Sequence, residues 1–309
     1  MSLRKNTEQI INSLKQQNHS FKSFKMISSG EFDIDDADWN YKDLYHAKFV
    51  HNDLSPSIFS MSGHEIAQTV TQKILFFNIT YMMVQYDSGP QHLTYVSSIT
   101  PFFIIINTEF IKKSKLITDV ITTYNIGSSK LLLTIFFPFI KWSITKNYNK
   151  LMVGDMGMRL RKGYLRKLGV SFIKKKERYT FTETLNLNQK NCVYKISIFN
   201  SSRSSKVLIT KKDGPIVKEF LTGTSDPWGL RGVISNNKLS LYPRMCDHEG
   251  ACLDNVIPIK NIVSCPWHGK KIKPINENSI IENNKFNLSY NKKNYRFNFN
   301  NNSIKLTVT

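Results

Sequence analysis

Apolar and polar residues alternate with two different periods along the first half of the chain. Between residues 68 and 123 the alternation is largely every second position, which predicts strands of a sheet, and Ser-Gly-Pro at 88–90 indicates a turn between them. Over residues 128–168 apolar residues recur at helical intervals, which predicts one long helix. A shorter pattern at 8–14 predicts an amphipathic helix within a polar N-terminal segment, residues 1–30.

The second half of the chain has a different pattern. It follows a run of charged residues at 174–178, which suggests a linker, and consists of short alternating segments typical of strands. We therefore expect an α+β domain at residues 1–172 and an all-β domain at residues 173–309. The predicted strands of the second domain include residues 193–198, 206–209, 238–242, 295–299 and 304–308.

The charge of the chain is strongly positive, with a formal net value of +20. The lysines are scattered, which favours an ordinary solvated basic surface over a nucleic-acid interface; an acidic redox partner and an anionic membrane surface are the remaining alternatives. No apolar run reaches the roughly 18 residues that a membrane-spanning helix needs. The N-terminus also lacks the apolar region of a signal peptide. We expect a cytoplasmic protein that binds no nucleic acid and has no transmembrane segment.

Two short motifs in the second half combine cysteine with histidine. Cys246 and His248 form a C-x-H motif, and Cys265 and His268 form a C-x-x-H motif, with sixteen residues between the two. Two thiolates can hold one iron and two imidazoles the other iron of a [2Fe–2S] cluster. Glycines in both motifs permit tight turns whose backbone N–H groups can point at the cluster sulfurs. The spacing therefore predicts a cluster held by two loops.

Mononuclear zinc is the main alternative for these four residues. Zinc sites with two Cys and two His usually pair two cysteines in one loop and two histidines in another. Here each loop mixes the two residue types. The mixed loops favour the iron–sulfur interpretation.

Residues 243–274, and more loosely residues 180–309, resemble a Rieske domain. Rieske proteins of cytochrome bc complexes carry an extra cysteine in each loop, and these form a disulfide. Here Trp267 occupies the middle of the second loop, so Cys252 has no such partner there. The resemblance is therefore to the Rieske domains of oxygenases and soluble ferredoxins.

A second candidate metal motif lies upstream. Asp43, His46 and His51 form the pattern D-x-x-H-x-x-x-x-H. On a helix, Asp43 and His46 would share a face, with His51 reachable if the helix ends or bends there. Asp43 could also be only a carboxylate at a helix start. Two histidines with one carboxylate form the facial triad that binds non-haem Fe(II) and leaves positions open for O₂.

This motif, preceded by Asp-Trp-Asn-Tyr-Lys at 38–42, resembles the catalytic domain of Rieske non-haem iron oxygenases. The resemblance implies a helix-grip (START/SRPBCC-like) fold, with His46 and His51 as iron ligands and a carboxylate on the closing helix as the third. It implies that Asp43 bridges an iron ligand to a cluster ligand of a neighbouring subunit. We expect the third ligand to be Asp155, chosen among the four acidic candidates Asp87, Glu109, Asp119 and Asp155. The family usually has its Rieske domain first, so the domain order here is reversed.

The resemblance also implies an activity. Electrons from NAD(P)H would pass through a separate reductase or ferredoxin to the [2Fe–2S] cluster and then to a mononuclear Fe(II). That iron would activate O₂ to hydroxylate or desaturate an organic, hydrophobic small molecule, in a homotrimeric enzyme. The alternative is a Rieske electron-transfer protein fused to a non-catalytic ligand-binding domain, in which His46 and His51 are incidental.

Overall fold

The chain forms two compact units in a computed structural model. Unit 1 comprises Met1–Gly169 with Lys174–Glu183, and unit 2 comprises Val170–Ile173 with Thr184–Thr309. The structure describes residues 7–51, 54–62, 65–74, 77–89, 91–176, 181–185, 206–208, 217–222, 230–235, 238–254, 256–276, 279–280, 283, 285–290, 293–300 and 303–308.

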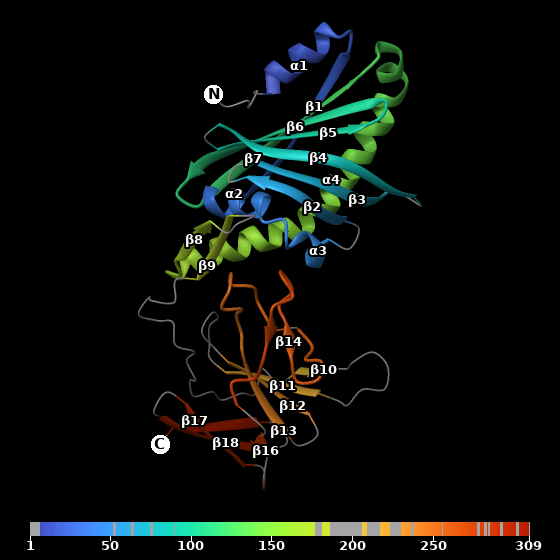
Figure 1. The fold of residues 1–309 in the computed structure, drawn as a ribbon. Coiled ribbons are helices and arrows are strands. Elements are labelled where there is room, and N and C mark those ends of the chain that lie inside the picture. Colours follow the sequence, from blue (N-terminus) through green and yellow to red (C-terminus); the bar gives the residue numbers. More distant parts are fainter. Residues whose placement is uncertain are drawn as a thin grey trace. The chain divides into compact units, whose positions relative to one another are not determined.

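Unit 1 is built on a seven-stranded antiparallel sheet in the order β1-β7-β6-β5-β4-β3-β2 (Figure 1). Except between β1 and β7, neighbours in the sheet are also neighbours in the chain, so hairpins connect most of it. The strands are β1 (Ser20–Gly30), β2 (Leu54–Ser62), β3 (Glu65–Ile74), β4 (Phe77–Gly89), β5 (His92–Ile99), β6 (Phe102–Ser114) and β7 (Ile117–Ser128).

A helix of 38 residues, α4 (Lys130–Lys167), follows the last strand and packs on β1 and β7. Its start is capped by the Ser129 hydroxyl, which accepts a hydrogen bond from the Leu132 N–H, and its last turn carries basic residues that suit the helix dipole. Leu133 anchors it in a core with Phe24 and Ile126. An antiparallel sheet that holds a long C-terminal helix is the helix-grip arrangement, so this predicted α+β fold is confirmed for unit 1.

The N-terminal segment differs from the expectation. The helix α1 covers Thr7–Gln16, and residues 20–30, placed in the polar N-terminal segment and not predicted as a strand, form the edge strand β1. This strand pairs with β7 along its whole length, from Ser20 opposite Ser128 to Gly30 opposite Thr118. Pairing with a distant strand outweighed the local pattern here, as tertiary context often does.

The described part of unit 2 contains strands and no helix. Five strands form one sheet in the order β10-β11-β12-β13-β16, and β17-β18-β19 form another. The strands are β10 (Lys206–Leu208), β11 (Val217–Thr222), β12 (Leu230–Ser235), β13 (Lys238–Pro243), β14 (Val263–Ser264), β15 (Lys271–Ile272), β16 (Ser279–Ile280), β17 (Lys285–Tyr290), β18 (Lys293–Asn300) and β19 (Ser303–Val308). The predicted strand at 193–198 lies outside the described residues.

The charged segment expected as a linker is partly a strand. β8 (Phe172–Lys176) pairs with β9 (Phe181–Leu185) in a two-stranded sheet, so residues 174–176 belong to regular structure. The remaining residues of that segment lie outside the described part. Among the helices that the structure describes, none combines the length and the hydropathy needed to cross a membrane.

Candidate metal centres

Three residues expected to bind one iron lie together in unit 1. The His46 Nε2 and the His51 Nε2 lie 3.2 Å and 3.0 Å from the same Asp155 Oδ1. The three side chains are buried or nearly so, and their ligand atoms all lie within 4.8 Å of one another. The structure thus brings Asp155 to two histidines that precede it by 109 and 104 residues.

The other three acidic candidates lie elsewhere in unit 1, each beside a basic or imidazole group. The distances are 3.1 Å from Asp87 Oδ1 to Lys42 Nζ, 3.5 Å from Glu109 Oε1 to His92 Nε2, and 3.5 Å from Asp119 Oδ2 to Lys113 Nζ.

The spacing suggested that the two histidines share a helix with Asp43. The structure shows no such continuous helix. The helix α2 (Ile34–Lys42) ends before Asp43, which is its C-cap residue rather than a helix-start carboxylate. A separate single-turn helix, α3 (Ala47–Val50), follows. His46 is the N-cap of α3 and His51 is its C-cap, so one helical turn spaces the two imidazoles, whose ring centroids are 5.4 Å apart.

A row of polar contacts fastens α2 to α4 and thereby positions the site. Successive pairs run in opposite directions along the two helices: Arg166 Nε to Asp36 Oδ1 at 2.9 Å, Lys162 Nζ at 3.3 Å from the centre of the Trp39 ring, and Arg159 Nε to Asn40 Oδ1 at 2.7 Å. The Asn40 amide then donates to Asp155 Oδ1 at 3.5 Å. On α4 the partners are three or four residues apart and share one face, and the last position of that face is Asp155, the candidate carboxylate ligand.

Gly154 permits the close approach of α4 to α3. A Cβ atom at this position would lie 2.5 Å from Val50 Cγ1 and 3.3 Å from His51 Cε1. Any larger residue would therefore push against the helical turn that carries both histidines. Gly154, Asn40 and Arg159 were not assigned a role from the sequence; a glycine inside a helical pattern next to a candidate ligand was the available signal.

Electrostatic pairing sets the charges of these three side chains. Burial lowers the pKa of His46, but the hydrogen bond to Asp155 and the nearby carboxylate of Asp43 outweigh burial and raise that pKa to about 10. Burial opposes ionisation of Asp155, yet His46, His51 and Arg159 hold the pKa of its carboxyl well below the usual range. The Asp43 Oδ2 lies 3.6 Å from His46 Nδ1, on the side of the ring away from Asp155.

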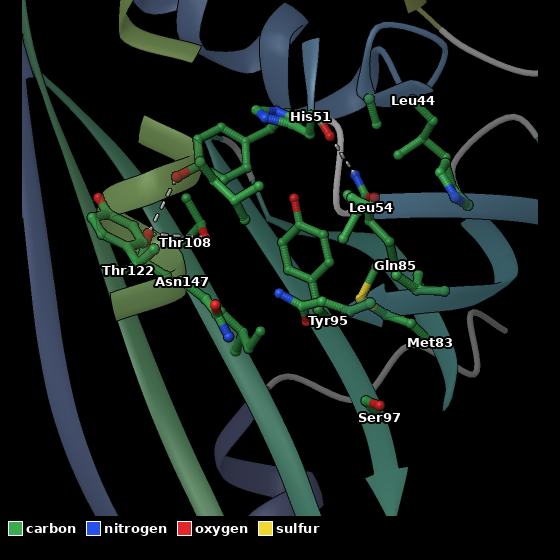
Figure 2. A pocket seen from close by; sticks show the side chains of 18 of the residues that line it. Leu44, His51, Leu54, Met83, Gln85, Tyr95, Ser97, Thr108, Thr122 and Asn147 are labelled. Carbon is green, nitrogen blue, oxygen red and sulfur yellow. Dashed lines mark hydrogen bonds between the residues drawn. The ribbon is translucent and has the colours of Figure 1, made fainter. Parts of the chain in front are cut away.

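The triad borders a cavity of about 290 Å³ between the sheet and α4. Figure 2 shows its wall, where Tyr95 projects from β5 toward the region of His51. Polar groups are interspersed with apolar ones: Thr108 and Thr122 lie with their hydroxyls 3.4 Å apart, and the Tyr41 hydroxyl is 3.4 Å from Thr122. Burial raises the pKa of Tyr81 to about 12 and those of Tyr95 and Tyr124 well above the usual value, so these phenols stay neutral. The cavity therefore has room for a small organic molecule beside the candidate ligand atoms.

The two Cys/His loops of unit 2 have the same backbone geometry. In the first, the Cys246 N–H donates to the Ala251 carbonyl at 2.9 Å and the Gly250 N–H donates to the Cys246 carbonyl at 3.0 Å. In the second, Cys265 and Gly269 repeat both bonds at 2.8 Å, with Lys270 in place of Ala251. Each loop closes through its glycine, with φ of 88° at Gly250 and 67° at Gly269, a region that favours glycine.

The four side chains meet as two pairs. The buried thiols of Cys246 and Cys265 are hydrogen-bonded to each other, and the rings of His248 and His268 lie 5.3 Å apart. The hydrogen bond from Cys246, helped by backbone N–H groups of Trp267 and His268, lowers the pKa of Cys265 to about 6. N–H groups aimed at sulfur are what a bound cluster requires.

Glu249 is a further residue that the sequence did not single out. Its buried carboxylate lies 3.5 Å from His268 Nε2, and its ligand atoms group with those of His248 and His268. Carboxylates are common neighbours of histidines that bind metals. Trp267, which stands in the second loop where a disulfide-forming cysteine would otherwise lie, is buried.

Comparisons with known proteins concern about half of the chain. No protein-family model matches it, and no curated protein does. Among solved structures, norcoclaurine synthase from Thalictrum flavum is 11% identical, with 46% of this chain and 96% of that chain covered and a TM-score of 0.40. The Zhui aromatase/cyclase from Streptomyces sp. R1128 is 9% identical, with coverages of 48% and 96% and a TM-score of 0.39. A START superfamily protein from Mycobacterium smegmatis is 7% identical, with coverages of 47% and 98% and a TM-score of 0.37.

Proposed function

We propose that this protein is a Rieske-type oxygenase. Its mononuclear Fe(II) is held by His46, His51 and Asp155, and its [2Fe–2S] cluster by the two Cys/His loops of unit 2. The observation that carries the proposal is the approach of both imidazoles to one carboxylate oxygen, at 3.2 Å and 3.0 Å. Two histidines and one carboxylate beside an organic-sized cavity suit a non-haem Fe(II) oxygenase better than a simple binding protein.

The arrangement of unit 2 favours a two-iron cluster over one zinc ion. A single tetrahedral zinc needs all four ligand atoms around one point. Among the described residues, the Cys sulfurs do not group with the imidazoles within 4.8 Å, whereas His248 and His268 do group with Glu249. A sulfur pair separate from an imidazole pair fits one iron with two thiolates and the other with two imidazoles.

The residues around the triad would prepare it for chemistry. Asp43 lies beside the Nδ1 of His46 and would hold that ring with its Nε2 toward the metal. Asn40, itself held by Arg159, donates to Asp155 and would orient the carboxylate. The cavity would hold the organic substrate beside the site and limit the access of water. When bound, the metals would supply one-electron transfer and the activation of O₂.

The external steps follow from that chemistry. Electrons from NAD(P)H would arrive through a separate reductase or ferredoxin, and the product would be hydroxylated or desaturated. A bridging role of Asp43 toward a neighbouring subunit, and a homotrimer, remain predictions of the same proposal.

The test is electron paramagnetic resonance of anaerobically purified protein. After reduction by dithionite we expect a Rieske signal, with about two acid-labile sulfides per chain. Nitric oxide, an O₂ surrogate, should then add a high-spin signal, because Fe(II) with an open position becomes visible when it binds this gas. His46→Ala should abolish the second signal and leave the first.

Two outcomes would contradict the proposal. A Rieske signal with no response to nitric oxide, after added Fe(II), would leave an electron carrier fused to a binding domain. Zinc in place of iron and sulfide would remove the cluster and the redox function with it.

A further inference from the structure

The polar groups that line the cavity of unit 1 can be sorted by whether the protein already satisfies them. Many have partners. The side-chain carbonyl of Gln72 accepts from the Tyr81 hydroxyl at 3.2 Å, and the Ser97 hydroxyl donates to the backbone carbonyl of Met82 at 2.7 Å. Thr108 and Thr122 bond to each other. Buried polar atoms are almost always paired, so any that remain require a partner from outside the chain.

Gln85 has such an atom. Its side chain is 1% exposed, and its Nε2 donates to the Tyr41 backbone carbonyl at 3.1 Å. A carbonyl can only accept, so this bond fixes the orientation of the amide. The Gln85 Oε1 is left without a hydrogen-bond partner among the described residues, and the side chain lines the cavity.

Gln68 repeats the situation on the neighbouring strand. It lies on β3, directly opposite Met83 of β4. Met83 and Gln85 are two positions apart on β4, so Gln68 and Gln85 lie on the same face of the sheet. Gln68 is 1% exposed, it lines the cavity, and its Oε1 has no hydrogen-bond partner among the described residues. Two buried amide oxygens without a hydrogen-bond partner among the described residues therefore belong to side chains on adjacent strands that line one cavity.

The charged groups in the lining restrict the charge of the molecule that the cavity can bind. No lysine or arginine is among the described residues that line the cavity, and the ionisable groups other than tyrosine are Asp43 and the metal triad. An anion would find no lysine or arginine to pair with there, and the carboxylates and imidazoles are committed to the proposed metal site. Buried charges without partners are costly, so the lining selects an uncharged molecule.

We propose that the cavity takes an uncharged organic molecule that carries hydroxyl or amide hydrogens, which the side-chain carbonyls of Gln68 and Gln85 accept. A purely hydrocarbon substrate, the simplest version of the hydrophobic substrate expected from the sequence, would leave both acceptors unpaired. That the bound molecule is the one oxidised rests on the proposed oxygenase function; the binding preference does not.

The experiment measures binding of three probes of similar shape to the full, anaerobically purified chain by isothermal titration calorimetry. The probes are 2,6-dihydroxynaphthalene, which donates hydrogen bonds, 2,6-dimethoxynaphthalene, which only accepts them, and 2,6-dimethylnaphthalene, which does neither. We expect the diol to bind about tenfold more tightly than the dimethyl probe, since each of the two satisfied acceptors contributes a factor of about three. The absence of O₂ prevents turnover during the titration.

Substitutions then assign the preference to residues. Gln85→Met and Gln68→Met keep the side-chain length and remove the acceptor, so each should lower the preference for the diol about threefold or more. Gln17→Met is the matched control, because this glutamine is exposed and does not line the cavity, and it should keep the preference. Unchanged binding of the dimethyl probe shows that each variant retains the cavity.

Three results would overturn the inference: no diol preference in the unaltered protein, equal binding of the dimethoxy probe, or a full preference in both Gln85→Met and Gln68→Met. A failure of the oxygenase proposal is seen separately, as the loss of the metal signals. The probe preference would survive that failure.

Discussion

The two units assemble their candidate metal centres in opposite ways. Unit 2 draws its four residues from two short turns with the same hydrogen bonds, each closed by its own glycine. Unit 1 draws two histidines from the ends of one helical turn and a carboxylate from a helix more than a hundred residues later. A centre made of local turns depends on a few backbone bonds, whereas a centre made of distant segments depends on the packing of the whole unit. The following substitutions test that difference.

The largest effect is expected at the cysteine pair. Cys265→Ser removes a thiolate that soft iron–sulfur ligation requires, so the cluster absorption and the labile sulfide should disappear completely. The Fe(II) site of unit 1 should persist, because none of its ligands comes from these loops. Visible absorption spectra and metal analysis measure both.

Cys252→Ala is the control, since this cysteine belongs to neither pair. It should retain the cluster. Loss of the cluster in this control, or its survival in Cys265→Ser, would contradict the assignment of the ligands.

The next effect is at the carboxylate of unit 1. Asp155→Asn keeps the shape and removes the charge between two imidazoles, so the affinity for Fe(II) should fall about 100-fold. Calorimetric titration of the metal-free protein with Fe(II) under argon measures it. Asp119→Asn, whose carboxylate lies beside Lys113, should change the affinity little; equal losses in both variants would mean that Asp155 is not a ligand.

Packing around α4 gives a prediction of opposite signs for two glycines of one helix. Gly154→Ala places a methyl group against Val50 and His51 and should destabilise the protein by about 1–3 kcal/mol. Gly157→Ala meets no atom within 4 Å and should stabilise it by about 0.5–1 kcal/mol through helix propensity. Urea unfolding followed by circular dichroism compares the two. Similar effects from both would show that α4 does not press on α3.

The smallest predicted effect is the release of one proton when the metal binds. His46 is held protonated in the metal-free protein up to a pKa of about 10, and a metal binds only the neutral ring. Metal binding at neutral pH should therefore release about one proton from His46, and affinity should rise with pH up to about 10. Asp43→Asn removes one of the carboxylates that raise this pKa. The metal affinity of this variant should therefore stop rising at a lower pH. Calorimetric titrations with Co(II) in buffers of different ionisation enthalpy count the released protons. If the unaltered protein and Asp43→Asn show the same dependence of affinity on pH, Asp43 does not raise the pKa of His46.

The same contrast explains what the sequence could predict. Long periodic segments predicted the strands between residues 68 and 123 and the helix α4, because each is determined by one buried face. The two edge strands, β1 and β2, were missed; only pairing with β7 makes residues 20–30 extended. The two Cys/His loops were readable because spacing within a turn is fixed by its own few residues.

The centre of unit 1 was only partly readable. The spacing of His46 and His51 was visible, but Asp155 had to be chosen among four carboxylates, because only the folded packing of α4 against α2 selects it. Asn40 lies in the segment 38–42 noted in the sequence, but neither it nor Arg159 or Gly154 could be given a role from the sequence. Their contributions appear only when the two helices are placed side by side.

The most direct test of two separate centres is the iron content of three proteins purified in parallel without O₂. We predict about three irons per chain in the unaltered protein, about two in the His46→Ala/His51→Ala double variant, and about one in the Cys246→Ser/Cys265→Ser double variant. Iron that is unchanged by the histidine substitutions, or lost completely in either double variant while the protein stays folded, would contradict the account.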